Sequence, residues 1–175
     1  MLSFNQKTIK KNIHFQGIGL HTGKKVNVEL IPAEPNHGII FKRIDVEHNK
    51  SLIEANFKNI QSGELCTSLT NEDGISVKTV EHLLAAFSGL GISNVLVEID
   101  NEEIPILDGS AVNFVQSLIK AGICKQNATL NFCSIKKSIE VRNKKGWVKF
   151  EPADEFNFSN VAISKNREGK KMMKL

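Results

Sequence analysis

The chain has 175 residues, of which 41% are hydrophobic and 24% charged, as in an ordinary globular protein. Residues 164–175 carry five basic side chains and one acidic, which accounts for the whole net charge of +4. The rest of the chain is therefore balanced, which excludes a nucleic-acid-binding surface on the folded part. No apolar run could span a bilayer, so we expect no transmembrane segment. Three cysteines without a CxxC spacing predict reduced thiols in a cytoplasmic protein.

The first forty residues predict three strands joined by short turns. Ile9, Ile13 and Phe15 share one strand phase, and a glycine-rich turn follows at residues 17–23. Apolar and polar residues then alternate over residues 26–30, and a third strand begins at residue 39. We expect these elements to form an antiparallel meander. A short strand over residues 65–69 and a turn at residues 71–74 are expected next.

Two amphipathic helices are predicted, over residues 80–90 and 111–121, with a strand at residues 95–99 between them. In each helix the apolar residues fall on a single stripe. Thr79 and Ser110 are the expected N-caps, and glycines follow both helices. One-sided helices beside half-buried strands predict an α+β two-layer sandwich, with one mixed or antiparallel sheet and both helices on one face.

A polar stretch at residues 125–127 predicts a domain boundary. We therefore expect a first domain over residues 1–125. A hairpin follows, with Ile139 and Val141 on one arm and Val148 and Phe150 on the other. One hairpin cannot bury a core alone, so residues 126–158 are expected to begin a second domain of the same type, and residues 159–175 to form a divergent basic tail.

The glycine turn at residues 17–23 does not fit a dinucleotide-binding fingerprint. Its third glycine comes one residue late, and a strand follows where that motif requires a helix. A tight hairpin that uses glycine at positive φ explains most of the segment. It does not explain His21, which lies on the turn.

Glu81 and His82 occupy the first turn of the first predicted helix and point away from its apolar stripe. Small residues surround them on that side, including Ala85, Ala86 and Gly89. The positive end of the helix dipole favours an ionised Glu81 and a neutral His82, which is able to ligate zinc. A solvated first-turn pair has the same pattern, and both interpretations stay open. Asp108, before Gly109, fits either a turn leading into a helix or a site residue.

Five segments together resemble the UDP-3-O-acyl-N-acetylglucosamine deacetylase family, in its order and at its spacing. They are Gly17–Gly23, Leu65–Thr67, Thr79–Leu83, Gly89–Ile92 and Glu103–Ser110. The resemblance covers roughly residues 8–157. It implies a zinc-dependent hydrolase of lipid A biosynthesis, which removes the N-acetyl group from a UDP-linked, acylated glucosamine.

The resemblance also implies roles for individual residues. His82 matches a zinc ligand, and Glu81 matches the general base for the attacking water. Leu65, Cys66 and Thr67 match residues near the substrate sugar, and Asp108 matches a site-supporting residue, a role we also expect for His21. The other two zinc ligands, a His and an Asp, belong to the family's second domain, which would cover the helical face.

Only one of the three expected protein ligands of zinc is therefore found in this sequence. We expect a truncated chain, from a premature stop, a frameshifted gene end or a fragment, that is inactive by itself. The alternative is a non-catalytic α/β module that turns nothing over.

Overall fold

The computed structural model describes residues 4–62, 65–131, 133–144, 146–154, 161–166 and 169–174, the last two ranges by their backbone. Two compact units divide between Leu130 and Asn131. The polar stretch at residues 125–127 lies inside strand β10 (Ile123–Thr129), which belongs to the first unit.

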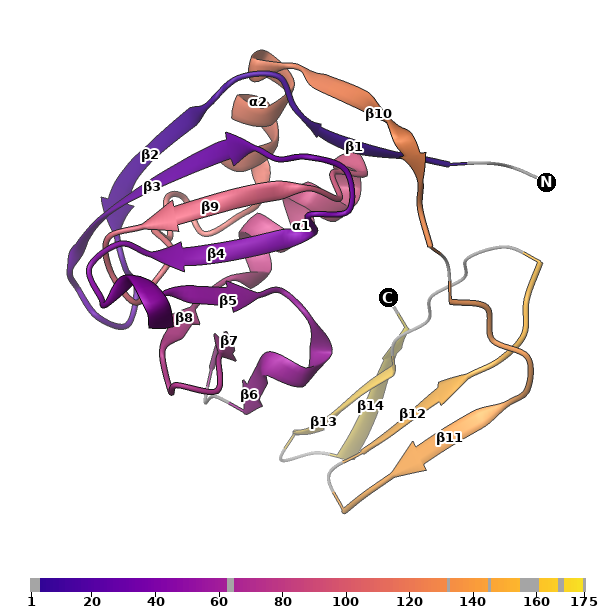
Figure 1. Ribbon diagram of the computed structural model, residues 1–175. Helices are drawn as coiled ribbons and strands as arrows, with labels where there is room; N and C mark the ends of the chain where they lie inside the picture. The colour runs from indigo at the N-terminus through magenta and orange to yellow at the C-terminus, as the bar shows by residue number, and fades with distance from the viewer. Residues whose placement is uncertain are drawn as a thin grey trace. The chain divides into compact units, whose positions relative to one another are not determined.

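A five-stranded mixed sheet forms the centre of the first unit (Figure 1). Its order is β2-β3-β9-β4-β5, and all neighbours are antiparallel except β4 and β9, which are parallel. The strands are β2 (Ile13–Ile18), β3 (Lys25–Pro32), β9 (Val95–Ile99), β4 (Ile39–Arg43) and β5 (Leu52–Glu54).

The expected meander is wrong in one respect, since β9 lies between β3 and β4 and pairs with both. The side chains of Val95, Val97 and Ile99 are fully buried. A strand this apolar is most stable in the middle of a sheet, where both edges are paired and one face is covered. The meander was predicted from the order of the strands along the chain, and that order does not indicate which strand takes the middle of the sheet.

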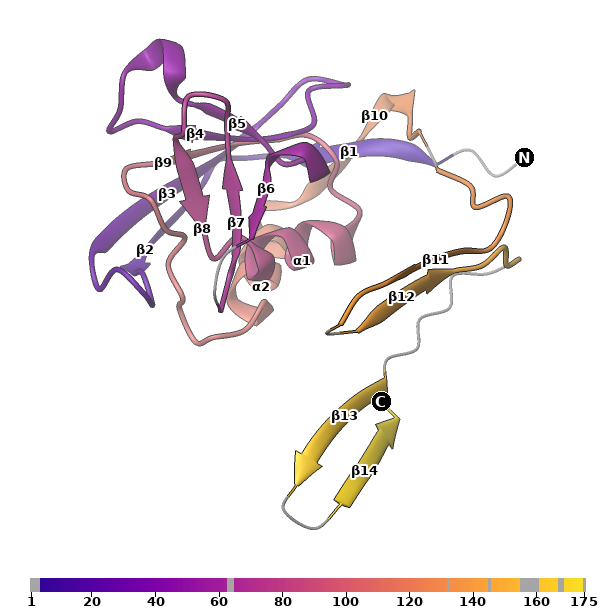
Figure 2. The same ribbon diagram turned by 90° about the horizontal axis from the view of Figure 1, so that it is seen from below.

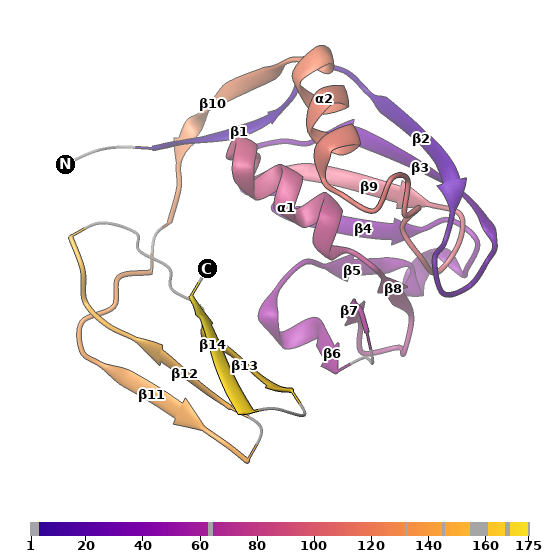
Figure 3. The same cartoon turned by 180° about the vertical axis from the view of Figure 1, so that it is seen from behind.

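Both helices, α1 (Glu81–Leu90) and α2 (Val112–Ala121), cover the same face of this sheet (Figures 1 and 3). The α+β class is thus confirmed. Gly91 and Gly122, both at positive φ, end the helices. The Ser110 hydroxyl accepts a hydrogen bond from the Val112 N–H at 3.1 Å. Thr79 and Ser110 as N-caps are nevertheless wrong, since Val80 and Ala111 hold those positions and neither is capped by a side chain.

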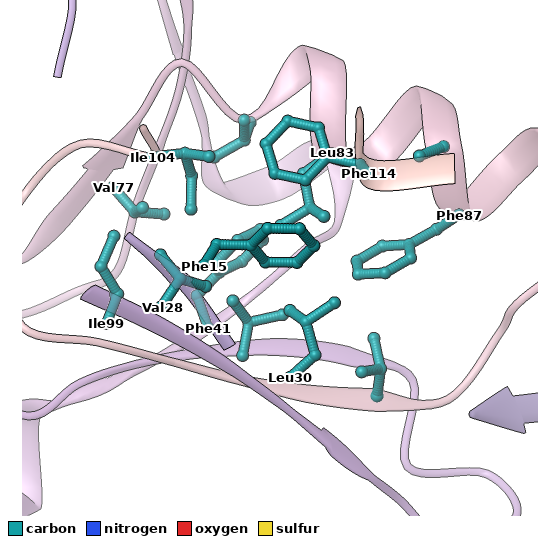
Figure 4. Packing of buried hydrophobic residues seen from close by; sticks show 14 of the residues in the cluster. Phe15, Val28, Leu30, Phe41, Val77, Leu83, Phe87, Ile99, Ile104 and Phe114 are labelled. Atoms are coloured by element: carbon teal, nitrogen blue, oxygen red, sulfur yellow. The ribbon is translucent and has the colours of Figure 1, made fainter. Parts of the chain in front are cut away.

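The core lies between the sheet and the helices (Figure 4). Leu83, Phe87, Phe114 and Leu118 are fully buried on the helix side. The Phe114 ring packs edge-to-face on Phe15, with centroids 5.0 Å apart. Ala86 is also buried, at the flank of the α1 stripe, so the expected outward surface of small residues keeps Ala85 and Gly89 and loses Ala86.

Smaller elements complete the first unit (Figure 2). A three-stranded antiparallel sheet contains β6 (Ile60–Ser62), β7 (Thr67–Thr70) and β8 (Ser76–Lys78), with the expected turn between β7 and β8. Single 3-10 turns occur at His48–Lys50 and Phe57–Asn59. Strand β1 (Asn5–Ile9) pairs with β10 and not with the central sheet.

A cluster of amide side chains, which we call the amide network, fastens β1 and β10 to the rest of the unit. The Nδ2 of Asn94, which is 2% exposed, donates to Gln6 Oε1 at 2.8 Å and to Gln126 Oε1 at 2.7 Å. Asn94 Oδ1 accepts from the Gly38 N–H, and Gln6 Nε2 donates to Asn36 Oδ1, both at 2.8 Å. Each member satisfies the polar groups of another, so Gln6 and Asn94 are buried without unpaired amides.

The second unit contains two antiparallel hairpins. In the first, β11 (Ile139–Arg142) pairs with β12 (Trp147–Phe150), which are the two expected arms, and the side chains of both strands are exposed. In the second, β13 (Val161–Asn166) pairs with β14 (Gly169–Lys174), so part of the segment expected as a basic tail is a paired strand. Throughout the described residues, no helix has the length and apolar character needed to cross a membrane.

Candidate active site

Glu81 and His82 form the first turn of α1, with both side chains partly buried. The Glu81 Oε2 accepts a hydrogen bond from the backbone N–H of Thr67 at 3.1 Å. The Val80 N–H in turn donates to the Thr67 carbonyl at 3.3 Å. The beginning of β7 is therefore joined to the beginning of α1 (Figure 2), and one oxygen of the Glu81 carboxylate is bound to β7.

The segment Leu65–Cys66–Thr67 thus lies beside Glu81, as a shared site requires. The Cys66 Sγ lies 3.7 Å from the Ser68 Oγ, and the Cys66 side chain is partly buried. Leu65 is 91% exposed and has a φ of 71°. A bulky residue in the left-handed region is unusual and costs about 1–3 kcal/mol, so the rest of the fold must impose this backbone.

His21 lies on the glycine turn with its side chain exposed, and the turn is attached to the site through Glu103. The backbone N–H of His21 donates to both Glu103 carboxylate oxygens, at 3.0 and 3.1 Å. The Thr22 N–H donates to Oε2 at 2.8 Å, and the Thr79 hydroxyl donates to Oε1 at 2.8 Å. Thr79 lies two residues before Glu81, so Glu103 connects the turn with the start of α1.

Glu103 is the residue that sequence analysis missed. It is 1% exposed, although the sequence shows only two adjacent glutamates, of which Glu102 forms ion pairs with Lys24 and Lys78. Burial alone would raise the pKa of the Glu103 carboxyl. The donors from His21, Thr79 and Thr22 outweigh burial and lower its pKa below the usual value. The site therefore rests on a buried carboxylate that is ionised at neutral pH.

Asp108 is exposed and accepts hydrogen bonds from the backbone N–H and the hydroxyl of Ser110, at 3.1 and 3.0 Å. The Ser110 N–H is the main cause that lowers the pKa of Asp108. These contacts shape the turn that leads into α2, where Leu107 also has a positive φ of 51°.

The opposite face of the central sheet carries a row of charged side chains. Glu29 on β3 lies directly across from Glu98 on β9, and Glu98 lies across from Lys42 on β4. The Lys42 Nζ is 2.8 Å from Glu98 Oε1, and the His14 Nε2 is 3.4 Å from Glu29 Oε1. A shallow hollow opens along part of this row, on the sheet face that the helices leave uncovered.

The donors of a metal site are only partly present. Within the described ranges, no group of three or more His, Cys, Asp or Glu side chains is arranged to hold a metal ion. His82 and Glu81 supply an imidazole and a carboxylate on adjacent positions. In kind these groups suit zinc, but in number they do not complete a site.

Comparison with known proteins agrees with this arrangement of segments. The family model described as UDP-3-O-acyl N-acetylglycosamine deacetylase matches residues 6–174. A UDP-3-O-acyl-N-acetylglucosamine deacetylase from Pseudoalteromonas atlantica is 44% identical over 169 residues, which are 93% of this chain and 55% of the relative. One from Histophilus somni is 43% identical over 167 residues, covering 92% of this chain and 54% of the relative.

These matches place the protein in a family whose members are named as deacetylases. The chain belongs to the UDP-3-O-acyl N-acetylglycosamine deacetylase family. It spans about half the length of the curated relatives that it matches. The match also continues to residue 174, beyond the limit at residue 157 expected from the quoted motifs.

Proposed function

We propose that this chain provides the first half of a zinc-dependent hydrolase that removes the N-acetyl group from UDP-3-O-acyl-N-acetylglucosamine in lipid A biosynthesis, in the cytoplasm. The observation that carries the proposal is the Glu81–Thr67 hydrogen bond beside His82. It brings together, in a member of the deacetylase family, the segments that resemble its general base, its substrate-contacting loop and its metal ligand.

His82 would hold the zinc ion through an imidazole nitrogen. The two remaining ligands, a His and an Asp, would come from the family's second domain. A zinc ion bound there supplies Lewis-acid polarisation of an amide carbonyl and lowers the pKa of water. The first turn of α1 suits this role because it places His82 and Glu81 at adjacent positions, both partly buried.

Glu81 is the proposed general base. The Thr67 N–H occupies Oε2 and restricts the orientation of the carboxylate. Oε1 would then accept the proton of the attacking water, and a lysine and a histidine of the family's second domain would assist proton delivery to the leaving amine. A positioned base of this kind typically contributes about 10²–10⁴-fold to the rate.

Leu65, Cys66 and Thr67 are proposed to contact the sugar of the substrate. The exposed Leu65 side chain and the partly buried Cys66 lie on the approach to Glu81, because Thr67 is bonded to it. His21 and Asp108 are proposed to support the site, His21 through its turn and Asp108 by shaping the entrance to α2.

We further propose that the 175-residue chain alone binds zinc weakly and shows no significant turnover. One imidazole leaves the ion mostly hydrated, so its water keeps a pKa nearer the aqueous value of about 9 than 7. A non-catalytic module with no turnover in any context is the second candidate. Because no complete set of ligands is found within the described residues, this second candidate also predicts no turnover by the isolated chain.

A fusion that supplies the missing ligands of the zinc site distinguishes the two candidate functions. Residues 1–158 are joined in frame to the second half of the Pseudoalteromonas atlantica relative, and acetate release from UDP-3-O-acyl-N-acetylglucosamine is measured beside bound zinc. We expect turnover that His82→Ala abolishes together with zinc binding. Glu81→Ala should keep zinc and reduce turnover at least about 100-fold.

Glu72→Ala, in the exposed turn after β7, is the matched control and should change neither quantity. An inactive but folded and zinc-loaded fusion would favour the non-catalytic module. Turnover by the isolated chain that Glu81→Ala removes would contradict the claim that the chain lacks ligands.

A further inference from the structure

Glu103 receives hydrogen bonds from two segments that are far apart in sequence. His21 and Thr22 belong to the turn between β2 and β3, whereas Thr79 belongs to the junction between β8 and α1. Three donors within 3.1 Å converge on a carboxylate that is 1% exposed. Fixed donors aimed at a buried charge define its position more tightly than a surface ion pair does.

The turn is shaped to receive this carboxylate. A Cβ added to Gly19 would lie 2.5 Å from Glu103 Oε2, closer than side-chain atoms can approach. A Cβ at Gly17 would lie 2.8 Å from the Cβ of Pro105, two residues after Glu103. Glycine at both positions thus lets the turn lie directly on the segment that contains Glu103.

The junction before α1 depends on the same carboxylate. Thr79 has a φ of 56°, a conformation that is strongly unfavourable for a β-branched residue. Its hydroxyl bond to Glu103 compensates for that conformation, and the neighbouring Lys78 is bridged to Glu103 through the backbone. The chain then reverses into Val80 and Glu81, whose contacts with Thr67 follow at once.

We infer that Glu103 is a positioning residue, which fixes the His21 turn and the first turn of α1 in a single mutual arrangement. Glu103 does not contact Glu81 or Thr67 itself. It acts through Thr79, whose position holds the Glu81 carboxylate against the Thr67 N–H. The catalytic use of this arrangement rests on the proposed function. The arrangement itself can be measured without any catalytic assay.

The test is residue-resolved amide hydrogen exchange by NMR on the 175-residue chain, with Glu103→Gln and with Glu102→Gln as the matched control. Glu103→Gln places an amide N–H₂ among donors and should speed exchange at His21, Thr22 and Thr67 at least about tenfold. The amides of β9 should stay within about twofold. Glu102→Gln should change none of them, because the Glu102 carboxylate pairs with the amines of exposed Lys24 and partly buried Lys78 and not with these amides.

Thr79→Val keeps the shape of the side chain and removes the hydroxyl. It should speed exchange at Thr67 and leave His21 and Thr22 protected, because their bonds to Glu103 persist. Unchanged Thr67 exchange in both variants would overturn the inference, as would an equal rise at every amide. Since no turnover is measured, a failure of the deacetylation assay and a failure of this test are separate outcomes.

Discussion

Two polar clusters in the first unit, the amide network and the hydrogen bonds around Glu103, stabilise different parts of the fold. The amide network joins β1 and β10 to the β9 region through neutral side chains, and the positive φ of its Asn36 is a conformation that asparagine tolerates. The Glu103 cluster uses a full charge and a strained threonine. A neutral network keeps the unit closed at small electrostatic cost, whereas the charged cluster lies next to the proposed catalytic residues.

The difference shows where this protein buries a charged side chain and where it uses neutral ones. Burying a carboxylate is costly unless several donors satisfy it, and such donors must be held rigidly to do so. The need for rigid donors is useful beside an active site. A buried carboxylate that loses much free energy when its donors move also keeps the segments of those donors in place. Neutral amides are sufficient where only closure of the fold is needed.

The largest expected effect is on the charged cluster. Glu103→Ala leaves three donors without their acceptor and should lower the free energy of unfolding by about 3 kcal/mol, measured by urea denaturation. Glu102→Ala, at the neighbouring surface position, should cost less than about 1 kcal/mol. Equal losses in the two variants would show that the buried carboxylate has no special weight.

A smaller loss is expected in the neutral cluster. Asn94→Ala removes the partner of Gln6, Gln126 and the Gly38 N–H, but the two glutamine side chains keep other contacts. We expect a loss of about 2 kcal/mol in the same measurement. Gln116→Ala, at an exposed position of α2, serves as the control and should stay near the parent. A cost for Asn94→Ala above that of Glu103→Ala would reverse the comparison.

The two clusters should also differ in their response to acid. The folded state lowers the pKa of Glu103 below its usual value of 4.5. Ionised Glu103 therefore contributes stability above the usual pKa, and this contribution is lost as the pH falls through the folded-state pKa. Stability measured between pH 7 and pH 3 should decline less steeply in Glu103→Gln than in the parent. Asn94→Ala should decline in parallel with the parent, and equal slopes in all three proteins would contradict the assignment.

The smallest effect is expected on the sheet face that the helices leave uncovered, where the charged side chains are only partly buried. Lys42→Met removes the ion pair with Glu98 and leaves Glu98 directly across from Glu29. The expected loss is about 0.5 kcal/mol, and it should shrink at high salt. Adding Glu29→Gln should recover most of it, because the like-charge pair is then absent. Full additivity of the two changes would show that the row is not coupled.

Much of the fold could be predicted because it depends on local pattern. The apolar stripes of α1 and α2, the glycines after them and the alternation in β3 and β9 predict the elements and their buried faces. The order of strands could not be predicted the same way. It depends on which strand best fills the middle of the sheet, and that is a competition among distant segments.

The site shows the same limit. Five short segments predicted that Thr67 and Glu81 belong together, and their hydrogen bond fits that expectation. Glu103 stood inside one of these segments without being singled out. Nothing in two consecutive glutamates tells which is buried, because the answer depends on a turn 82 residues earlier and on the φ of Thr79.

The pairing of β1 with a strand near the end of the first unit affects the order in which the unit folds during synthesis. Its ladder partner, β10, begins more than a hundred residues later, at Ile123. A ribosome adds roughly 5–20 residues per second, so β1 waits on the order of ten seconds for that partner to be synthesised. During this interval the five strands of the central sheet and α1 are synthesised, while Ile9 lacks the strand that pairs with it. The first strand to leave the ribosome is therefore among the last to be fixed in place.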